Sequence, residues 1–337
     1  MSNAITEKQL SEAQPTERQR RDSEADSDVP PGWSYNPSSW RQRMPIIVIA
    51  LVNGALAAYL AACEMGFVRH AWDPLFGTGT DRVLNSSISR AFPVPDAALG
   101  AGLYLLEALF SIVGDRRRWK SKPWLALTFG IVIAPLFIVT LVLLVLQPVA
   151  VHAWCTLCLI IAAGMLLLVP LALDEVIAAM QFLVQSARDG RPFWETLRGG
   201  EESHSDGGDR SADEAESGPF QGFSVPWNLA VCAALGIWLM ACPVVLRIRG
   251  ESSVSCEVTG ALIIAIATLA CAEPLRPIRF AGVACGIWLL IFSPWTFPAV
   301  SPVTYANELL VGIAVILCSA PRGRIRDRFG SWDRYLV

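Results

Sequence analysis

The chain has 337 residues, of which 53% are hydrophobic and only 17% are charged, and its net charge is −3. Soluble domains are about 45–50% apolar and about 25% charged, so this composition favours a membrane protein. Nucleic-acid binding requires a basic surface, whereas this chain has a slight excess of acidic residues. We therefore expect no nucleic-acid partner.

The chain begins with a polar segment. Residues 1–43 are rich in Glu, Gln, Ser, Arg and Pro, and 1–40 contain no apolar run. This composition predicts a disordered cytoplasmic tail and excludes a cleavable signal peptide in this segment. The first apolar helix is then expected to act as an uncleaved membrane signal.

Long apolar runs separate the charged segments and predict about eight transmembrane helices. A helix rises ~1.5 Å per residue and needs ~20 apolar residues to cross hydrocarbon. The expected spans are 45–64, 97–114, 123–147 and 153–173, followed by 227–246, 257–273, 280–297 and 305–320. The predicted fold class is an all-α integral membrane protein.

Lys and Arg residues gather in the loops on one side of this arrangement. They lie before the first span (Arg41, Arg43), in 116–122, at Arg276 and Arg279, and in 322–328. Because short cytoplasmic loops carry an excess of Lys and Arg, we predict a multi-pass inner-membrane (cytoplasmic-membrane) protein with both termini in the cytoplasm. The loop 65–96 and the segment before the fourth span then face outward.

The two groups of spans are joined by a polar connection. Residues 174–188 carry apolar side chains at helical spacing, which predicts either a helix on the inner leaflet or an extension of the fourth span. The acidic, Gly- and Ser-rich residues that follow are typical of a flexible connector. The expected domains are a tail 1–43, a four-helix domain 44–188, an acidic linker 189–221, a second four-helix domain 222–328 and a C-terminal tail 329–337.

The second group contains an internal repeat. Gly236-Ile-Trp-Leu239, followed by Pro243, recurs as Gly286-Ile-Trp-Leu289, followed by Pro294. An acidic residue (Glu257, Glu308) and a glycine (Gly260, Gly312) come after each copy. Each copy therefore predicts a helical hairpin, and we expect the hairpins to pack through small residues.

One pair of residues in the chain is suited to chemistry. The fourth span begins His152-Ala-Trp-Cys-Thr-Leu-Cys158, and cysteines at i and i+3 of a helix lie close enough to form a disulfide. Cys155 stands at the helix N-terminus, where unpaired N–H groups and the helix dipole favour a thiolate. The predicted orientation places the pair near the periplasmic face, where disulfides are made and kept.

Other interpretations of this pair stay open at this point. The two cysteines could be small apolar residues or a static disulfide. Half of a zinc site is the third alternative, but no second CxxC or His pair completes it, so we expect no metal. His152 could stabilise a Cys155 thiolate or take its proton.

Two stretches of the first domain resemble the vitamin K epoxide reductase (VKOR) family, whose members pass electrons between thiols and a quinone. One runs from Val83-Leu-Asn-Ser-Ser87 through residues 92–101, and the other is Trp154-Cys-Thr-Leu-Cys158. The likeness covers about 45–185. Residues 222–328 resemble the SPW repeat family, whose motif is present as Ser293-Pro294-Trp295.

The resemblance implies roles for particular residues. Cys155 and Cys158 would be the catalytic pair, with Cys158 facing the quinone, and Ser86 matches a family serine in the outer loop near the active site. Trp72 and Phe76 are candidates to roof the quinone pocket. The implied electron acceptor is a membrane quinone, ubiquinone or menaquinone, and the implied donor is a periplasmic thioredoxin-like protein or another thiol substrate.

The sequence departs from the family at the relay cysteines of the outer loop. The matching positions are Trp72 and Thr80, with Asp73 kept beside the first. Thiol–disulfide exchange needs a sulfur at each step, so the usual relay cannot run. Partner thiols could reach Cys155 directly, another cysteine (Cys63, Cys242 or Cys256) could substitute, or the redox reaction could be lost.

The sequence thus leaves two functions. The first is a quinone-linked thiol/disulfide oxidoreductase that passes electrons from periplasmic thiols through Cys155 and Cys158 to a quinone. The second is a non-catalytic membrane protein that binds a quinone, a lipid or a partner through a bundle that has lost the loop cysteines.

Overall fold

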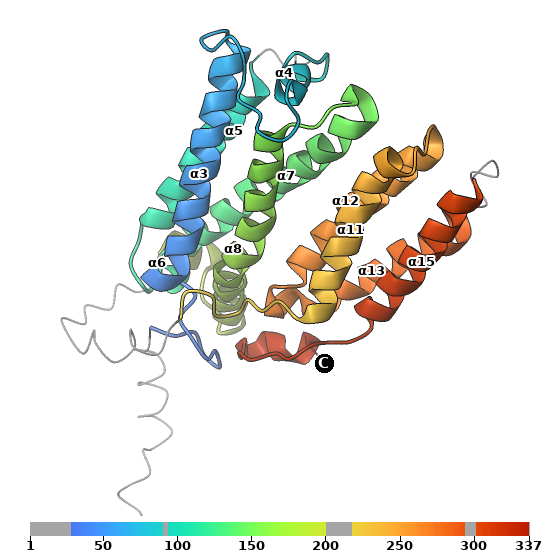
Figure 1. The fold of residues 1–337 in the computed structure, drawn as a ribbon. Helices are drawn as coiled ribbons and strands as arrows, with labels where there is room; N and C mark the ends of the chain where they lie inside the picture. Colours follow the sequence, from blue (N-terminus) through green and yellow to red (C-terminus); the bar gives the residue numbers. More distant parts are fainter. Residues whose placement is uncertain (1–27, 90–93, 200–217, 294–300, 337) are drawn as a thin grey trace, which may run out of the picture.

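The computed structural model describes residues 28–89, 94–199, 218–293 and 301–336. In these ranges the regular elements are helices, apart from two isolated β-bridges, and they form two bundles side by side (Figure 1). Most of the predicted tail, the connector 200–217, and Pro294 and Trp295 of the SPW motif lie outside the described residues.

The first bundle contains four long helices. They are α3 (Trp40–Glu64), α5 (Asp96–Ile112), α7 (Pro123–Leu146) and α8 (Thr156–Arg188). Short helices connect them: α4 (Gly79–Leu84), α6 (Arg118–Ser121), the π-helical turn η2 (Gln147–Val151) and, after α8, α9 (Phe193–Arg198). Ile46, Tyr104, Phe129 and Met165, one from each long helix, meet in its core.

The second bundle consists of two helical hairpins. The first pairs α11 (Trp227–Val245) with α12 (Glu251–Leu269), and a 3₁₀-helix η3 (Glu273–Arg279) leads into the second. The second pairs α13 (Phe280–Ile287) and its π-helical continuation η4 (Trp288–Phe292) with α15 (Pro302–Ser319). The short helix η5 (Gly330–Tyr335) follows near the chain end.

Seven helical segments among the described residues are long and apolar enough to cross a membrane. The remaining expected span is α5, which has 17 residues and packs along α3. The all-α membrane fold predicted from the sequence is therefore confirmed. The spans differ at their ends: α12 begins at Glu251 and α15 at Pro302, both earlier than predicted.

The segment after the fourth span extends α8 without a break, so the helix-extension alternative holds. Two acidic residues in this extension are buried, and each has a partner. Glu175 pairs with Arg118 of α6, and the hydroxyl of Tyr35 donates a hydrogen bond to Asp174 at 2.6 Å. These partners offset much of the cost of burying the two carboxyls, although Asp174 Oδ1 has no hydrogen-bond partner among the described residues.

The repeat predicted for the second half appears as two hairpins with the same glycine contact. A Cβ added to Gly236 would lie 2.7 Å from the carbonyl oxygen of Gly260, and one added to Gly286 would lie 2.8 Å from that of Gly312. Only glycine permits backbones to approach this closely. These close contacts lie within each hairpin, so packing of the two hairpins on each other through small residues stays a prediction.

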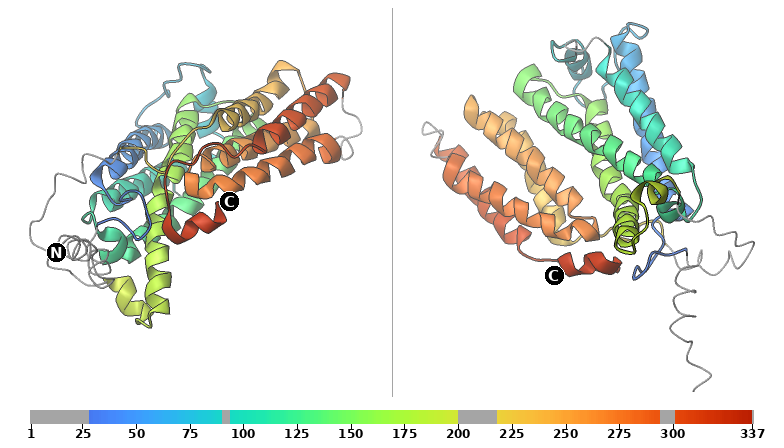
Figure 2. Two further views of the ribbon diagram at one scale, coloured as in Figure 1. Left: turned by 90° about the horizontal axis from the view of Figure 1, so that it is seen from below. Right: turned by 180° about the vertical axis from the view of Figure 1, so that it is seen from behind.

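Both ends of the described chain pack at one end of the bundles (Figure 2). Trp33 and Tyr35 meet Phe329 in edge-to-face contacts, and Trp33 forms a β-bridge with Phe329. Burial and the neighbouring Asp174 carboxyl raise the pKa of Tyr35 well above its usual range. Residues 28–43 and 329–336, assigned to tails from composition, are thus folded here, because their aromatic side chains supply a buried cluster.

The two bundles share an apolar interface. Leu144 of α7 and Leu166 of α8 pack with Met240 of α11 and Ile264 of α12. The CxxC pair belongs to a separate apolar cluster at the start of α8, and Trp154 and Leu159 beside it also pack against the interface.

Candidate functional site

Cys155 and Cys158 form a disulfide at the start of α8, with their Cα atoms 5.2 Å apart. Cys155 is the N-cap residue in an extended conformation, and its sulfur accepts a hydrogen bond from the Cys158 N–H at 3.0 Å. The side chain of Gln147 in η2 accepts the Cys155 N–H at 2.9 Å. A thiolate at this position would therefore be stabilised by a helix N-terminus that already donates to it.

A cap formed by residues 72–84 covers the pair, and Asp73 holds it together. One carboxylate oxygen of Asp73 accepts the N–H groups of Leu75 and Phe76, and the other accepts the N–H and hydroxyl of Thr80. Thr156, the first residue of α8, also donates to Asp73. Burial raises the pKa of Asp73, but these hydrogen bonds outweigh it and hold the pKa well below its usual range.

The cap touches the backbone next to the disulfide. A Cβ added to Gly79 would lie 2.0 Å from the carbonyl oxygen of Trp154, so this position requires glycine. Phe76 faces the Trp154 ring at a centroid distance of 6.5 Å. Cys155 is 0% exposed beneath this cover, so a macromolecular thiol can reach it only when the cap moves.

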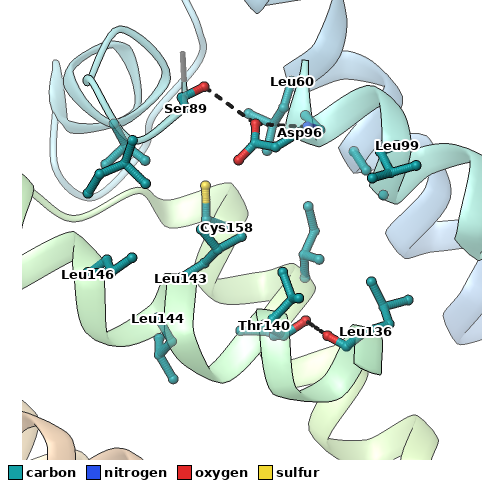
Figure 3. Close-up of a pocket in the computed structure, with 18 of the residues that line it drawn as sticks. Leu60, Ser89, Asp96, Leu99, Leu136, Thr140, Leu143, Leu144, Leu146 and Cys158 are labelled. Atoms are coloured by element: carbon teal, nitrogen blue, oxygen red, sulfur yellow. Dashed lines mark hydrogen bonds between the residues drawn. The ribbon is translucent and has the colours of Figure 1, made fainter. Parts of the chain in front are cut away.

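Cys158 lines a cavity of about 700 Å³, to whose wall the cap contributes Val83 and Leu84. In Figure 3 its sulfur points toward the end of the cavity where Asp96 and Leu60 lie. The walls are mostly aliphatic side chains of α5 and α7, among them Leu99, Leu103, Leu136, Val139 and Leu143. Leu99 and Val139 are themselves exposed, so the cavity reaches the bundle surface between these helices.

The cavity has one polar end, which the sequence did not identify. The Ser89 hydroxyl donates to the Glu64 carboxylate at 2.5 Å and lies 3.4 Å from Asp96 (Figure 3). Asp96 is the first residue of α5, and its side chain accepts the N–H of Ala97 at 2.9 Å. The signal missed was Glu64, the acidic residue at the C-terminal end of α3, which shares the Ser89 hydroxyl with Asp96 at the start of α5.

The structure separates the sequence-predicted site residues into two groups. Ser86 lines the cavity together with Cys158. Trp72, Phe76 and His152 are outside the set of described residues that line it. Trp72 and Phe76 are exposed on the cap, and the His152 ring is exposed and contacts the carbonyl oxygen of Pro148 at 2.9 Å. Their contribution to a pocket stays a prediction.

The possible substitute cysteines lie in different places. Cys63, near the end of α3, packs against the apolar cluster that contains Cys155. Cys242 and Cys256 lie together in the core of the second bundle. Of these three cysteines, only Cys63 shares an apolar cluster with the CxxC pair, although it is distant from the pair in sequence. Its side chain is partly exposed.

Comparison with known families agrees with the two-bundle division. The profile of the vitamin K epoxide reductase family matches residues 44–173, and that of the SPW repeat domain matches residues 226–321. No curated protein and no solved structure gave a significant match.

Proposed function

The chain carries a domain of the vitamin K epoxide reductase family fused to an SPW repeat domain, and we propose that it is a quinone-linked thiol/disulfide oxidoreductase. The observation that carries this proposal is the place of Cys158. Its sulfur belongs to a disulfide on one side and lines a large apolar cavity on the other. This arrangement joins a two-electron thiol centre to a site for a lipid-soluble molecule.

The cavity fits a quinone by size and by chemistry. Small-molecule sites are commonly about 300–1,000 Å³, with apolar walls and a few polar groups. Here the walls are aliphatic, and Ser86, Ser89, Asp96 and Gln147 supply the polar groups. The cavity reaches the surface between α5 and α7, so a quinone could enter from the bilayer without crossing water.

The reaction balances within this site. When Cys155 and Cys158 close from dithiol to disulfide, one S–S bond forms and two electrons and two protons leave. A bound quinone supplies the acceptor for both electrons and both protons. The carboxyl groups of Glu64 and Asp96, at the polar end, can hold protons next to the cavity.

Electrons would come from a thiol partner at the outer face of the inner membrane, such as a periplasmic thioredoxin-like protein. Positions 72 and 80 hold Trp and Thr, so in this proposal the partner thiol attacks Cys155 directly. Because Cys155 is buried under the cap, this step requires residues 72–84 to open. Displacement of the Asp73 and Gly79 contacts is the movement we expect.

The second candidate is a non-catalytic protein that binds a quinone, a lipid or a partner in the same cavity. The closed cap favours it, since Cys155 is covered by a tightly hydrogen-bonded loop without a relay cysteine. The two functions differ in one requirement: binding tolerates loss of the sulfurs, and electron transfer does not.

The test is quinone reduction by the purified protein in lipid, with a small dithiol as donor. We expect turnover in the wild type and only the uncatalysed rate in Cys155→Ala and in Cys158→Ala. Cys285→Ala, a buried cysteine of the second bundle, is the matched control and should retain turnover. Equal rates in the wild type and the blank, with folded protein and excess quinone, would establish the binding function instead.

A further inference from the structure

The second bundle contains a buried polar cluster that the proposed reaction does not use. Its centre is formed by Cys242 of α11, Cys256 of α12 and Glu308 of α15, all completely or almost completely buried. The two sulfurs interact with each other, and the Cys242 thiol donates to the Leu239 carbonyl oxygen at 3.3 Å. Both are free cysteines in this structure.

Two adjacent residues of α15 hold this pair from the other hairpin. The Asn307 side chain donates to the Cys242 sulfur at 3.5 Å, and the Cys256 thiol donates to Glu308 Oε1 at 3.5 Å. Ser293 donates to the same Glu308 oxygen at 3.0 Å. Within the described residues, Glu308 Oε2 is buried without a hydrogen-bond partner. A buried carboxyl with a free oxygen next to a thiol proton is placed to accept that proton.

The internal repeat shows that these positions do not need cysteine for packing. Cys242 precedes Pro243 as Ser293 precedes Pro294, and Cys256 lies four residues before Gly260 as Glu308 lies four residues before Gly312. The second hairpin therefore carries Ser293 and Glu308, which hydrogen-bond to each other, where the first carries two thiols. Polar residues without sulfur satisfy the fold at equivalent places, so sulfur at both positions of the first hairpin points to a use for sulfur.

The helices that carry the two thiols are already as close as backbones permit. The Gly236–Gly260 contact brings α11 and α12 together in antiparallel register beside the thiol pair. A disulfide between two helices requires Cα atoms about 4.4–6.8 Å apart, which only closely packed helices provide.

We propose that Cys242 and Cys256 are a second dithiol/disulfide site, oxidised by a small neutral peroxide, with Glu308 as the proton acceptor. Because both sulfurs are buried, a protein thiol cannot reach them, whereas hydrogen peroxide is small enough to penetrate a helical bundle. The closed disulfide would link α11 to α12 within the SPW repeat domain.

The steps balance without any further reagent. Glu308 takes the Cys256 proton, the thiolate attacks one peroxide oxygen, the O–O bond breaks, and the departing hydroxide takes the proton from Glu308. This gives a sulfenic acid on Cys256 and one water. The Cys242 sulfur then attacks the Cys256 sulfur, the S–O bond breaks, and the Cys242 proton leaves with hydroxide as the second water.

The same bundle supplies an internal control. Cys232 of α11 and Cys318 of α15 also interact with each other, but the neighbouring polar group is the Ser319 hydroxyl, 4.0 Å from the Cys232 sulfur, and not a carboxyl. Peroxide chemistry that depends on Glu308 should distinguish the two pairs in one sample. It also requires no quinone, so this site can be tested whatever the outcome at Cys155 and Cys158.

The experiment treats the full chain in lipid with hydrogen peroxide, alkylates the remaining thiols after denaturation, and maps linked peptides by mass spectrometry without reduction. We expect a Cys242–Cys256 linked peptide that a reductant removes. The rate at which this linked peptide forms should fall by at least about tenfold in Glu308→Gln. This threshold is conservative, because positioned general bases contribute about 10²–10⁴-fold. The oxidation rate of Cys232 and Cys318 should not change.

Two results would overturn the proposal. If Cys242 and Cys256 both stay alkylatable in the unmutated protein after the partly exposed Cys63 has been oxidised, the site is not a redox pair. This measurement needs no variant, so a folding defect cannot obscure it. If the linked peptide forms equally fast in folded Glu308→Gln, the carboxyl is not the proton acceptor.

Discussion

The two bundles each place a cysteine pair near the same end of the molecule, but they build it differently. Cys155 and Cys158 lie within one helix turn, already form a disulfide, and border a cavity of about 700 Å³. Cys242 and Cys256 lie on facing helices, remain thiols, and are enclosed by Glu308 and Asn307. Glu257, next to Cys256, interacts electrostatically with His152, which shows how near the two ends are.

This contrast separates two requirements for thiol chemistry. The first pair has a route for a lipid-soluble molecule through the cavity and a route for a partner under a removable cap. The second pair has the Glu308 carboxyl in contact with the Cys256 thiol, and no comparable opening is described around it. We therefore expect thiol–disulfide exchange with protein partners at the first pair only. Variants in each bundle test whether access to a cysteine pair depends on that bundle alone.

The largest effect is expected from Gly79→Ala. The new methyl group would overlap the Trp154 carbonyl oxygen, and backbone atoms cannot move aside cheaply, so the cap should be displaced at a cost of about 3 kcal/mol. Turnover with a small dithiol should persist, and Cys155, once reduced, should be alkylated faster. Gly102→Ala is the control, because nothing lies within 4 Å of its added Cβ. Unchanged alkylation in Gly79→Ala would mean that the cap does not restrict access.

The next effect concerns Asp73→Asn, which removes the charge that holds the cap. Hydrogen bonds to a charged group contribute about 1.5–3 kcal/mol, so we expect the cap to lose about 2 kcal/mol. The pKa of Asp73 is lowered in the folded state, so its contribution is present above the ordinary value of about 3.9 and is lost as the pH falls below it.

Hydrogen exchange of residues 72–84, corrected for intrinsic rates, measures this effect. Protection in the wild type should decrease from about pH 4 downward, whereas Asp73→Asn should be weakly protected at every pH. An equal pH dependence in both proteins would assign the titration to another group.

A smaller effect is expected from Gly286→Ala in the second bundle. Its methyl group would meet the Gly312 carbonyl oxygen at 2.8 Å and the flexible Ile316 side chain at 2.5 Å, so the cost should be about 1–2 kcal/mol. Thermal unfolding should shift, but quinone reduction at Cys155 and Cys158 should stay within about twofold. A large loss of turnover would show that the two bundles act as one unit.

The smallest effect is expected from Cys63→Ser. Cys63 packs on the cluster around Cys155, but a small dithiol can bypass it, so turnover with that donor should change by less than about twofold. Turnover with a thioredoxin-like donor is the second measurement. Its selective loss would identify Cys63 as the substitute for the missing loop cysteines.

The sequence predicted what depends on local pattern. Apolar runs located the helices, the recurrence of Gly236 and Gly286 located the hairpins, and the spacing of Cys155 and Cys158 located a thiol pair. The extension of α8 was left open, because the partners that bury Asp174 and Glu175 come from distant segments.

What the sequence could not give depends on contacts between distant residues. The polar end of the cavity joins Glu64, Ser89 and Asp96, and the second thiol site joins three helices, so neither leaves a short motif. Amino-acid composition also failed to predict that the segments near both termini are folded, because a few aromatic residues such as Trp33 and Phe329 suffice to order them.

The most direct test of the central claim is a single turnover without excess donor. The protein is reduced, the reductant is removed, and one equivalent of quinone is added in lipid before the thiols are alkylated and mapped. We expect the Cys155–Cys158 disulfide to return with one quinol formed per disulfide, and Cys158→Ala to form none. If Cys155 and Cys158 remain alkylatable in folded protein with quinone present, the electron-transfer account is contradicted.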